Sequence, residues 1–190
     1  AVRSSIAMIS ELRIWNADRE KADKMPVNMG VGVNTDNVVT GNIGSSKRMD
    51  FTMIGDGVNL AARLEGSCKT YGAQIIISEF TQNKLKGIYA LRELDRIVVK
   101  GKTEPVSIFE VLDFHDDESF PARMDVVGHF TEGLSHYRST KFDDAIKSFR
   151  AALDVNSEDV PSKLYIERCE LFKKSPPPKD WSGEWVMTEK

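Results

Sequence analysis

With 190 residues and 41% hydrophobic content, the chain can bury a core and should hold one domain or two small ones, at roughly 100–200 residues per domain. Its formal net charge of -3 argues against a general nucleic-acid binder, because such proteins carry clustered basic charge that displaces counterions from phosphates. No apolar run approaches the ~20 residues of a membrane span, and no secretory signal is visible. We therefore predict a soluble, cytoplasmic segment that makes no membrane contact, although a larger parent protein could still be anchored in a membrane.

The two cysteines, Cys68 and Cys169, are far apart in the sequence. Neither belongs to a Cys-x-x-Cys motif or to a Cys/His spacing, so the sequence suggests neither a disulfide framework nor a zinc site. We expect two reduced thiols that are buried or half-buried.

The first element is a helix predicted over residues 3–16, because its apolar residues recur at helical spacing. The chain enters this pattern directly after Ala1, so we expect it to be a piece of a longer protein. Alternating apolar residues at 27–34 predict a strand. Residues 34–37 are rich in Asn and Asp and predict a hairpin turn, with a return strand at 38–43.

The two strands of this predicted hairpin are unusually rich in glycine. Strand glycines weaken a sheet unless something must approach the backbone closely. A packed helix is the simpler explanation, and a bound ligand is the alternative. The glycines concerned are Gly30, Gly32, Gly41 and Gly44.

The central part of the chain mixes helices with strands. Residues 56–70 predict a helix, with Asp56 as the N-cap and Gly72 as the stop signal. Three consecutive isoleucines within 74–78 predict a strand buried on both faces. A short helix and two further strands are expected at 79–86, 91–99 and 106–112. Helices combined with mostly antiparallel strands indicate an α+β sandwich.

The last third of the chain has a different character. An acidic, aperiodic stretch at 114–123 predicts a linker, and three amphipathic helices are expected at 124–137, 141–154 and 159–172. Small and aromatic residues in these helices are spaced as in a tetratricopeptide unit. Such a unit cannot bury its own face alone, so we expect it to pack on the preceding domain or on a partner. The residues are Gly133, Tyr137, Phe142, Ala145, Phe149 and Ala152.

The most informative stretch lies between Asp50 and Arg63. A β-branched and aromatic run ends at Gly55, and Asn59 and Arg63 then recur four residues apart, which places an amide and a guanidinium on one helical face. Thr52 stands near the end of the preceding strand. Such a set suits an anionic, hydrogen-bonding ligand such as a nucleotide. From spacing alone, Arg63 is equally well a solvated surface arginine.

Together with Gly41-Asn42-Ile43-Gly44 upstream and Val99-Lys100-Gly101-Lys102 downstream, this stretch resembles the second half of the catalytic domain of class III adenylate/guanylate cyclases. The resemblance covers about residues 1–112. It implies an incomplete ferredoxin-like α/β sandwich of the nucleotidyl cyclase type over 1–113, followed by a linker, a small all-α tetratricopeptide-like extension at 124–173 and a tail at 174–190. Asp36 departs from the family pattern, which usually has glycine there.

The resemblance implies roles for five residues. Asn59 would orient the ribose, Arg63 would bind the reacting phosphate, and Lys100 would reach the triphosphate. Thr52 would meet the purine edge, with the backbone of Ile54 close by. Because bacterial adenylate cyclases often carry threonine or aspartate at the position of Thr52, ATP is preferred over GTP as the substrate.

The resemblance also implies a metal requirement that this chain does not meet. The two aspartates that bind metal in the family lie in the first half of its catalytic domain, and nothing in this chain matches them. The two magnesium ions expected in the complete domain therefore have no ligands here, and Asp56 is better explained by capping than by metal binding. We predict that the chain alone forms no cyclic AMP.

Class III cyclases build their active site between two catalytic domains, so the resemblance implies a homodimer of a bacterial-type adenylate cyclase in signal transduction. The incomplete sheet should leave apolar surface open, which predicts dimerisation, domain exchange or aggregation. The alternative is a non-catalytic, cyclase-like regulator that presents its helices at 124–172 to a protein partner. A free-standing tetratricopeptide adaptor would explain only the last third of the chain.

Overall fold

A computed structural model describes residues 1–45, 48–98, 105–178 and 180–186. In chain order its elements are α1 (Val2–Lys21), β1 (Val31–Val33), β2 (Val39–Ser45), β3 (Arg48–Ile54), α2 (Asp56–Tyr71), β4 (Ile75–Ser78), α3 (Glu79–Gln82), β5 (Leu91–Val98), β6 (Val106–Val111), α4 (Arg123–Arg138), α5 (Phe142–Val155), α6 (Val160–Lys174) and β7 (Trp185–Val186).

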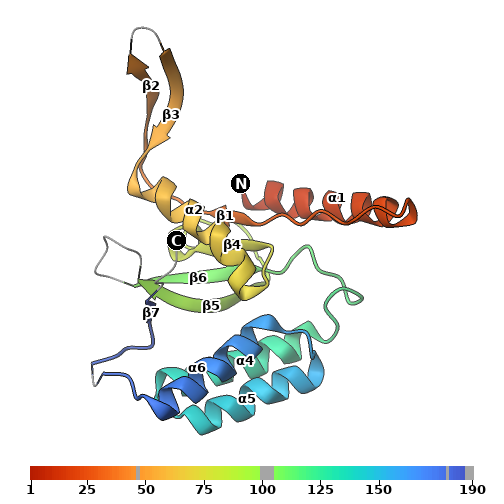
Figure 1. Cartoon of the computed structure of the whole chain (residues 1–190), viewed down its shortest axis with the longest axis vertical. Coiled ribbons are helices and arrows are strands. Elements are labelled where there is room, and N and C mark those ends of the chain that lie inside the picture. The colour runs from red at the N-terminus through yellow and green to blue at the C-terminus, as the bar shows by residue number, and fades with distance from the viewer. Residues whose placement is uncertain (46–47, 99–104, 179, 187–190) are drawn as a thin grey trace.

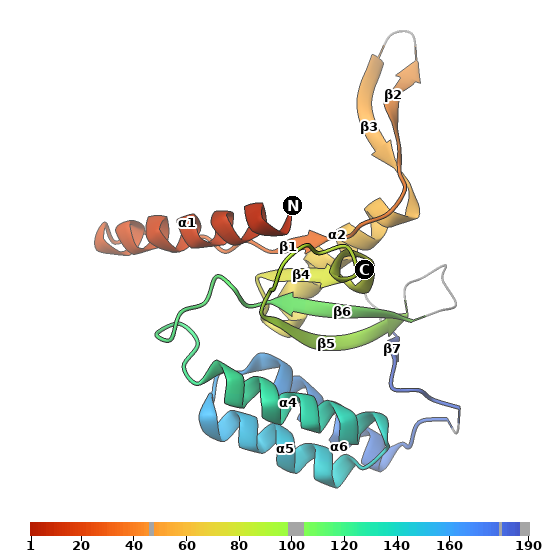
Figure 2. The same cartoon turned by 180° about the vertical axis from the view of Figure 1, so that it is seen from behind.

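The main sheet has the strand order β1-β4-β6-β5-β7. Strands β1 and β4 are parallel, as are β5 and β7, whereas β4 and β5 both run antiparallel to β6. The antiparallel hairpin of β2 and β3 forms a sheet of its own and stands away from the body of the molecule (Figure 1). Figure 2 shows from behind that α1 also projects outward and that α4–α6 pack below β5 and β6. The expected α+β fold is confirmed.

The predicted hairpin between residues 27–34 and 38–43 is wrong. Strand β1 pairs with β4, with Val31 opposite Ile75, and β2 pairs with β3 instead. The reason lies in Asn34, whose side chain donates to the Gly57 carbonyl at 3.1 Å and accepts from the Ser78 hydroxyl at 2.6 Å. These bonds tie the segment after β1 to α2 and β4, so the chain crosses to the start of α2 rather than reversing beside β1.

Helix α2 rests directly on the backbone of β1. A Cβ placed on Gly32 would lie 2.2 Å from the Ala61 carbonyl oxygen, and one on Gly30 would lie 3.0 Å from Cβ of Cys68. The packed-helix explanation is therefore confirmed for these two glycines. It does not extend to Gly41 in β2, where an added Cβ would meet nothing within 4 Å.

Strand β4 is the centre of the core and is buried on both faces, as predicted. Ile76 packs in a cluster with Leu60 and Leu64 of α2, whereas Ile75 and Ile77 belong to the cluster that contains Val2 and Ile9 of α1. The three isoleucines are inaccessible to solvent. Both free thiols are buried, and burial raises the pKa of Cys68 to about 11 and that of Cys169 to about 12.

The C-terminal end of α2 agrees with the sequence prediction, whereas its N-terminal end does not. Gly72 closes the helix in a left-handed conformation with φ of 63°, as expected for a stop signal. Asp56, however, is not the N-cap. Gly55 takes that position, and no side chain caps the helix. Asp56 lies one residue further on, in the first helical turn, where its negative charge is favourable near the positive end of the helix dipole.

The three predicted C-terminal helices are present as α4, α5 and α6, which we call the helical unit (residues 123–174). A Cβ on Gly133 of α4 would lie 2.6 Å from the ring of Phe149 of α5, so the small residue allows the two helices to close on each other. Trp181 of the tail packs edge-on to Tyr137 and Phe172, so the tail lies against these helices. The tetratricopeptide resemblance itself stays a prediction.

The helical unit is joined to the sheet by a buried arginine. Arg92 of β5 donates through Nε and Nη2 to one carboxylate oxygen of Glu110, at 2.9 and 2.6 Å, and through Nη1 to Asp159 at 2.5 Å. Asp159 also caps α6, because its second oxygen accepts from the amide of Ser162. The three charged side chains are at most 4% exposed. Burial raises the pKa of Glu110, although Arg92 opposes this shift.

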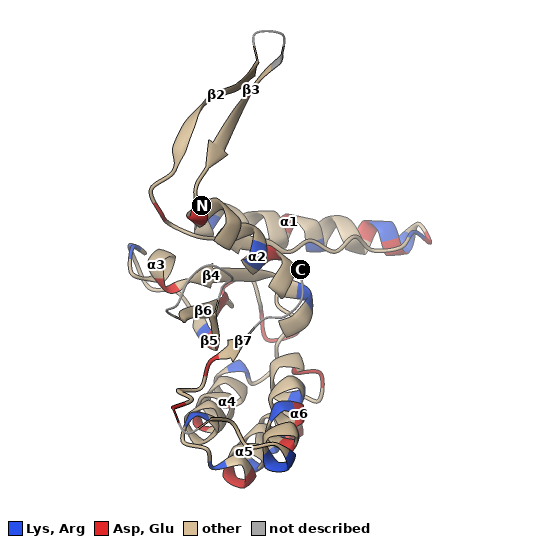
Figure 3. Ribbon diagram, turned by 60° about the vertical axis from the view of Figure 1, so that its left-hand side comes forward, with Lys and Arg blue, Asp and Glu red and all other residues tan. Residues whose placement is uncertain are grey.

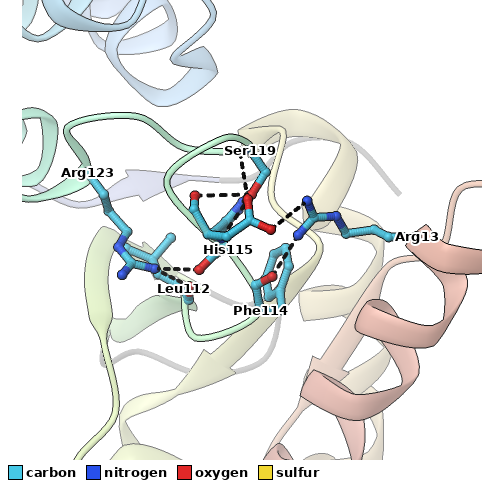
Figure 4. Close-up of polar contacts among 7 residues, drawn as sticks. Arg13, Leu112, Phe114, His115, Ser119 and Arg123 are labelled. Atoms are coloured by element: carbon cyan, nitrogen blue, oxygen red, sulfur yellow. Dashed lines mark hydrogen bonds and ion pairs between the residues drawn. The ribbon is translucent and has the colours of Figure 1, made fainter. Parts of the chain in front are cut away.

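The segment that connects the sheet to the helical unit is held by arginines from both sides (Figure 4). Arg13 of α1 donates to the Phe114 carbonyl at 2.8 Å, and Arg123 of α4 donates to the carbonyls of Leu112 and His115 at 2.8 and 3.1 Å. Burial, with a smaller effect of the nearby arginines, lowers the pKa of His115 to about 4. The predicted linker is thus a packed connection between α1, β6 and α4.

The contrast between Gly32 and Gly41 gives a paired test of how closely α2 packs on β1. Gly32→Ala should destabilise the fold by about 1–3 kcal/mol, because the new methyl group meets helix backbone that cannot move aside. Gly41→Ala, in open space, should change the free energy of unfolding by no more than about 0.5 kcal/mol. Urea unfolding followed by circular dichroism measures both. Equal stabilities of the two variants would contradict the close packing.

Candidate functional site

Asn59 and Arg63 lie in the first half of α2, on a face beside its buried stripe of Leu60 and Leu64. Asn59 is exposed and Arg63 is half-buried. Among the residues that the structure describes, neither side chain has a hydrogen bond or an ion pair. An amide and a guanidinium that are one helical turn apart and have no partner among the described residues are open to a ligand.

Thr52 and Ile54 lie on β3, in the hairpin that projects from the body (Figure 1). In the hairpin register Thr52 is opposite Gly41 and Ile54 is opposite Val39. Thr52 is half-buried, whereas Ile54 is 53% exposed. The pairing holds the backbone of both residues in extended conformation, and the threonine hydroxyl has no hydrogen-bond partner within the described part of the chain.

The four described site residues occupy two consecutive elements, because β3 passes through Gly55 directly into α2. No hydrogen bond joins Thr52 to Asn59 or Arg63 among the described residues, so their convergence on one ligand stays a prediction. Lys100 was predicted to reach the same ligand, but it lies outside the described residues.

Charges of both signs are interspersed on the surface away from these residues. Figure 3 shows Lys and Arg side by side with Asp and Glu along the helical unit and at the far end of α1. Within residues 1–45, 48–98, 105–178 and 180–186, no three His, Cys, Asp or Glu side chains gather as metal ligands would.

The hairpin carries large apolar side chains that remain in solvent. Val39 is 71% exposed, Met49 60%, Phe51 73% and Met53 57%. An isolated two-stranded hairpin is only marginally stable in water, and contiguous exposed apolar surface marks an interaction site. The exposed apolar side chains thus lie on the separate hairpin of β2 and β3 and not on an edge of the main sheet.

A second apolar surface follows α1. Met8 and Trp15 are each 50% exposed, and they line a shallow hollow together with Ala7, Glu11, Leu12 and Met29. This surface and the hairpin belong to the two elements that project from the body (Figure 2). In the part of the chain that the structure covers, no helix is long and apolar enough to cross a membrane.

Comparisons with known proteins place this arrangement in a family. The family model for the adenylate and guanylate cyclase catalytic domain matches residues 2–111. The chain is 31% identical over 172 residues to the terminal-differentiation specific adenylate cyclase of Dictyostelium discoideum, covering 89% of this chain and 8% of that protein. It is 38% identical over 118 residues to an adenylate cyclase of Anabaena cylindrica, covering 58% of this chain and 24% of that protein.

A solved structure of a bacterial light-regulated adenylyl cyclase is similar in fold, with a TM-score of 0.51 at 24% identity over 65% of this chain and 35% of that chain. The chain therefore belongs to the adenylate/guanylate cyclase catalytic domain family. It spans a quarter or less of the length of the two adenylate cyclases named above. The match to the Dictyostelium enzyme also extends beyond residue 111, where the family model ends, into the helical unit.

The lack of partners for Arg63 predicts that it contributes little to stability. Arg63→Ala should change the free energy of unfolding by no more than about 0.5 kcal/mol. Arg92→Ala serves as the matched comparison and should cost about 3–5 kcal/mol, because it leaves two buried carboxylates without their cation. Urea denaturation of both variants provides the measurement, and a large loss of stability in Arg63→Ala would show that its guanidinium is a structural group.

Proposed function

We propose that this chain is part of a nucleotidyl cyclase that converts ATP to cyclic AMP and pyrophosphate. The observation that carries the proposal is the pair Asn59 and Arg63, which lie on one face of α2, without partners in the part of the chain that the structure describes, inside the region that matches the cyclase family. In this reaction the ribose 3′-oxygen attacks the α-phosphorus. The new O3′–P bond forms as the bond from the α-phosphorus to the bridging oxygen breaks, pyrophosphate leaves with the electron pair, and the 3′-hydroxyl proton is released.

Arg63 is assigned to the phosphate that reacts. Negative charge is spread over the phosphoryl oxygens at the transition state, and a guanidinium stays protonated at every relevant pH and offers several parallel N–H donors to those oxygens. Asn59, one turn earlier, is assigned to the ribose, where its amide can both donate to and accept from hydroxyl groups. Holding the ribose and the α-phosphate from one rigid helix fixes their relative position.

Thr52 and the backbone of Ile54 are assigned to the purine, and Lys100 to the triphosphate. A threonine hydroxyl can donate to or accept from a base edge, and the preference for ATP over GTP follows from the threonine and from the adenylate cyclase relatives. The lysine is a mobile point charge suited to phosphate oxygens.

The two metal-binding aspartates of the family have no match in this sequence, so no step of the proposed reaction is assigned to a metal held by this chain. In the complete domain, two magnesium ions would be held by carboxylates contributed from outside this chain.

We further propose that the parent enzyme is a homodimer with its active sites between subunits, in intracellular signalling. The support is the hairpin, whose exposed Phe51, Met49 and Met53 flank Thr52. A second catalytic domain would cover these side chains and bring its own groups opposite Asn59 and Arg63. The alternative, a non-catalytic regulator, gives no reason for Asn59 and Arg63 to stand unpaired.

Arg63→Ala in the longer protein that contains this chain tests the assignment. The variant should keep its fold and lose cyclic AMP formation by on the order of 100-fold or more, since a charged donor to the transition state is removed. Lys69→Ala, at an exposed cation on the same helix, is the matched control and should keep full turnover. Undiminished turnover in Arg63→Ala would refute its role, and a parent protein with no turnover at all would favour the regulator.

The chain of residues 1–190 by itself should form no cyclic AMP from ATP and Mg²⁺, because the resemblance places the family's metal-binding aspartates in the half of the catalytic domain that this sequence does not match. Incubation of the purified chain with ATP, followed by chromatography of the nucleotides, checks this expectation. Turnover that scales with the concentration of the chain, and that Arg63→Ala abolishes, would show that the site is complete without any added segment.

A further inference from the structure

The C-terminal end of α2 is bonded to the helical unit through a buried network. The hydroxyl of Tyr71, the last residue of α2, donates to Oδ2 of Asp95 at 2.5 Å. Nη1 of Arg168, from α6, donates to the same oxygen at 2.5 Å, and its Nη2 donates to the Tyr71 hydroxyl at 3.3 Å. The three residues are at most 4% exposed. One carboxylate oxygen on the sheet therefore joins the end of α2 to α6.

The position of Asp95 depends on an irregularity in β5. The pairing with β6 shifts between Glu93 and Asp95, so that Leu94 and Asp95 are both buried instead of alternating. A bulge of this kind turns a side chain to a face that regular pleating would not allow. The other oxygen of Asp95 accepts from the amide of Arg96 at 2.7 Å, so both carboxylate oxygens have donors.

Arg168 is in turn fixed by aromatic rings. The centre of its guanidinium lies 4.1 Å from the ring centroid of Trp185 and 4.9 Å from that of Tyr165. A guanidinium between ring faces and bonded to a buried carboxylate has little freedom to move. The network thus holds the C-terminal end of α2 in a fixed position.

A separate contact places the same two helices against each other. Gly72, directly after α2, has a left-handed backbone, and a Cβ there would lie 2.7 Å from Cβ of Val160 in the first turn of α6. Leu164 of α6 also packs against the core cluster to which Leu60, Leu64 and Tyr71 of α2 belong. The helical unit therefore contacts the end of α2 and the core that α2 covers.

We propose that Tyr71 is a positioning residue of the cyclase reaction: through Asp95 and Arg168 it fixes α2 to the helical unit and so sets where Asn59 and Arg63 stand. Arg63 lies eight residues before Tyr71 on the same continuous helix, about 12 Å along its axis at 1.5 Å per residue. A tilt or slide at the anchored end is therefore transmitted to the two side chains. This inference rests on the proposed function, and it makes the helical unit a part of the catalytic scaffold.

A pair of tyrosine variants separates positioning from general stability. Tyr71→Phe removes only the hydroxyl that bonds to Asp95. Tyr165→Phe removes a hydroxyl that donates at 2.9 Å to the Leu94 carbonyl, in the same interface between α6 and β5 but without any bond to α2. Tyr165→Phe deletes this one buried hydrogen bond, whereas Tyr71→Phe deletes two, the bond to Asp95 and the bond from Arg168, and both variants keep an aromatic ring.

The first measurement uses the chain itself and needs no turnover. Hydrogen exchange should become faster at the backbone amides of the last two turns of α2 in Tyr71→Phe, whereas Tyr165→Phe should leave those amides at the wild-type rate. The same exchange rate in α2 for both variants would overturn the proposal, whatever the enzyme does.

The second measurement compares the two variants in the longer enzyme. Tyr71→Phe should lower kcat by about tenfold with little change in KM, because misplacement by about 1 Å can cost on the order of 100-fold at the transition state. Tyr165→Phe should keep the wild-type kcat. A full kcat in Tyr71→Phe, with faster exchange in α2, would overturn the positioning role. Lack of turnover in the wild-type enzyme would instead refute the proposed function. The hydrogen-exchange rates in α2 would then still test whether Tyr71 fixes the end of this helix.

Discussion

The structure depends on two arginines buried between the sheet and the helical unit. Arg92 of β5 binds Glu110 and the helix-capping Asp159, and Arg168 of α6 binds Asp95. Removing one member of such a pair leaves an uncompensated charge in a low-dielectric interior, so each contact holds only if both surfaces stay in place. The helical unit is therefore held to the sheet by two buried ion-pair networks.

This internal rigidity contrasts with the two elements that project from the body. The β2–β3 hairpin and α1 expose Phe51, Met53 and Trp15, although the sheet beside them buries its isoleucines completely. Apolar surface of this extent is stable in solution when another surface covers it. The proposed catalytic residues, Asn59 and Arg63, lie on a helix between the buried core and the projecting elements. One face of this helix is packed on the core, and its other face is exposed to solvent.

The sequence predicted the helix that carries Asn59 and Arg63 better than it predicted the pairing of the strands around that helix. The spacing of Asn59 and Arg63 placed both on one face of α2, since helical geometry is a local property. The pairing of β1 was mispredicted, because an Asn-rich segment after a strand is an equally good turn or crossing. The partner that decided between them was Ser78, which is 44 residues away from Asn34. Periodicity carries no information about such a bond.

The sequence by itself determined the elements, the family and the identity of the candidate site residues, because helix periodicity, the buried isoleucine strand and the motif from Asp50 to Arg63 are all written in neighbouring residues. Only the tertiary structure decided which strands pair, that Gly32 exists to admit α2, and that Arg168 meets Asp95 and Tyr71 from 73 and 97 residues away. These features depend on burial by elements that are distant in the sequence. A charged side chain needs a partner, and a glycine is needed for close packing, only where such an element covers the residue.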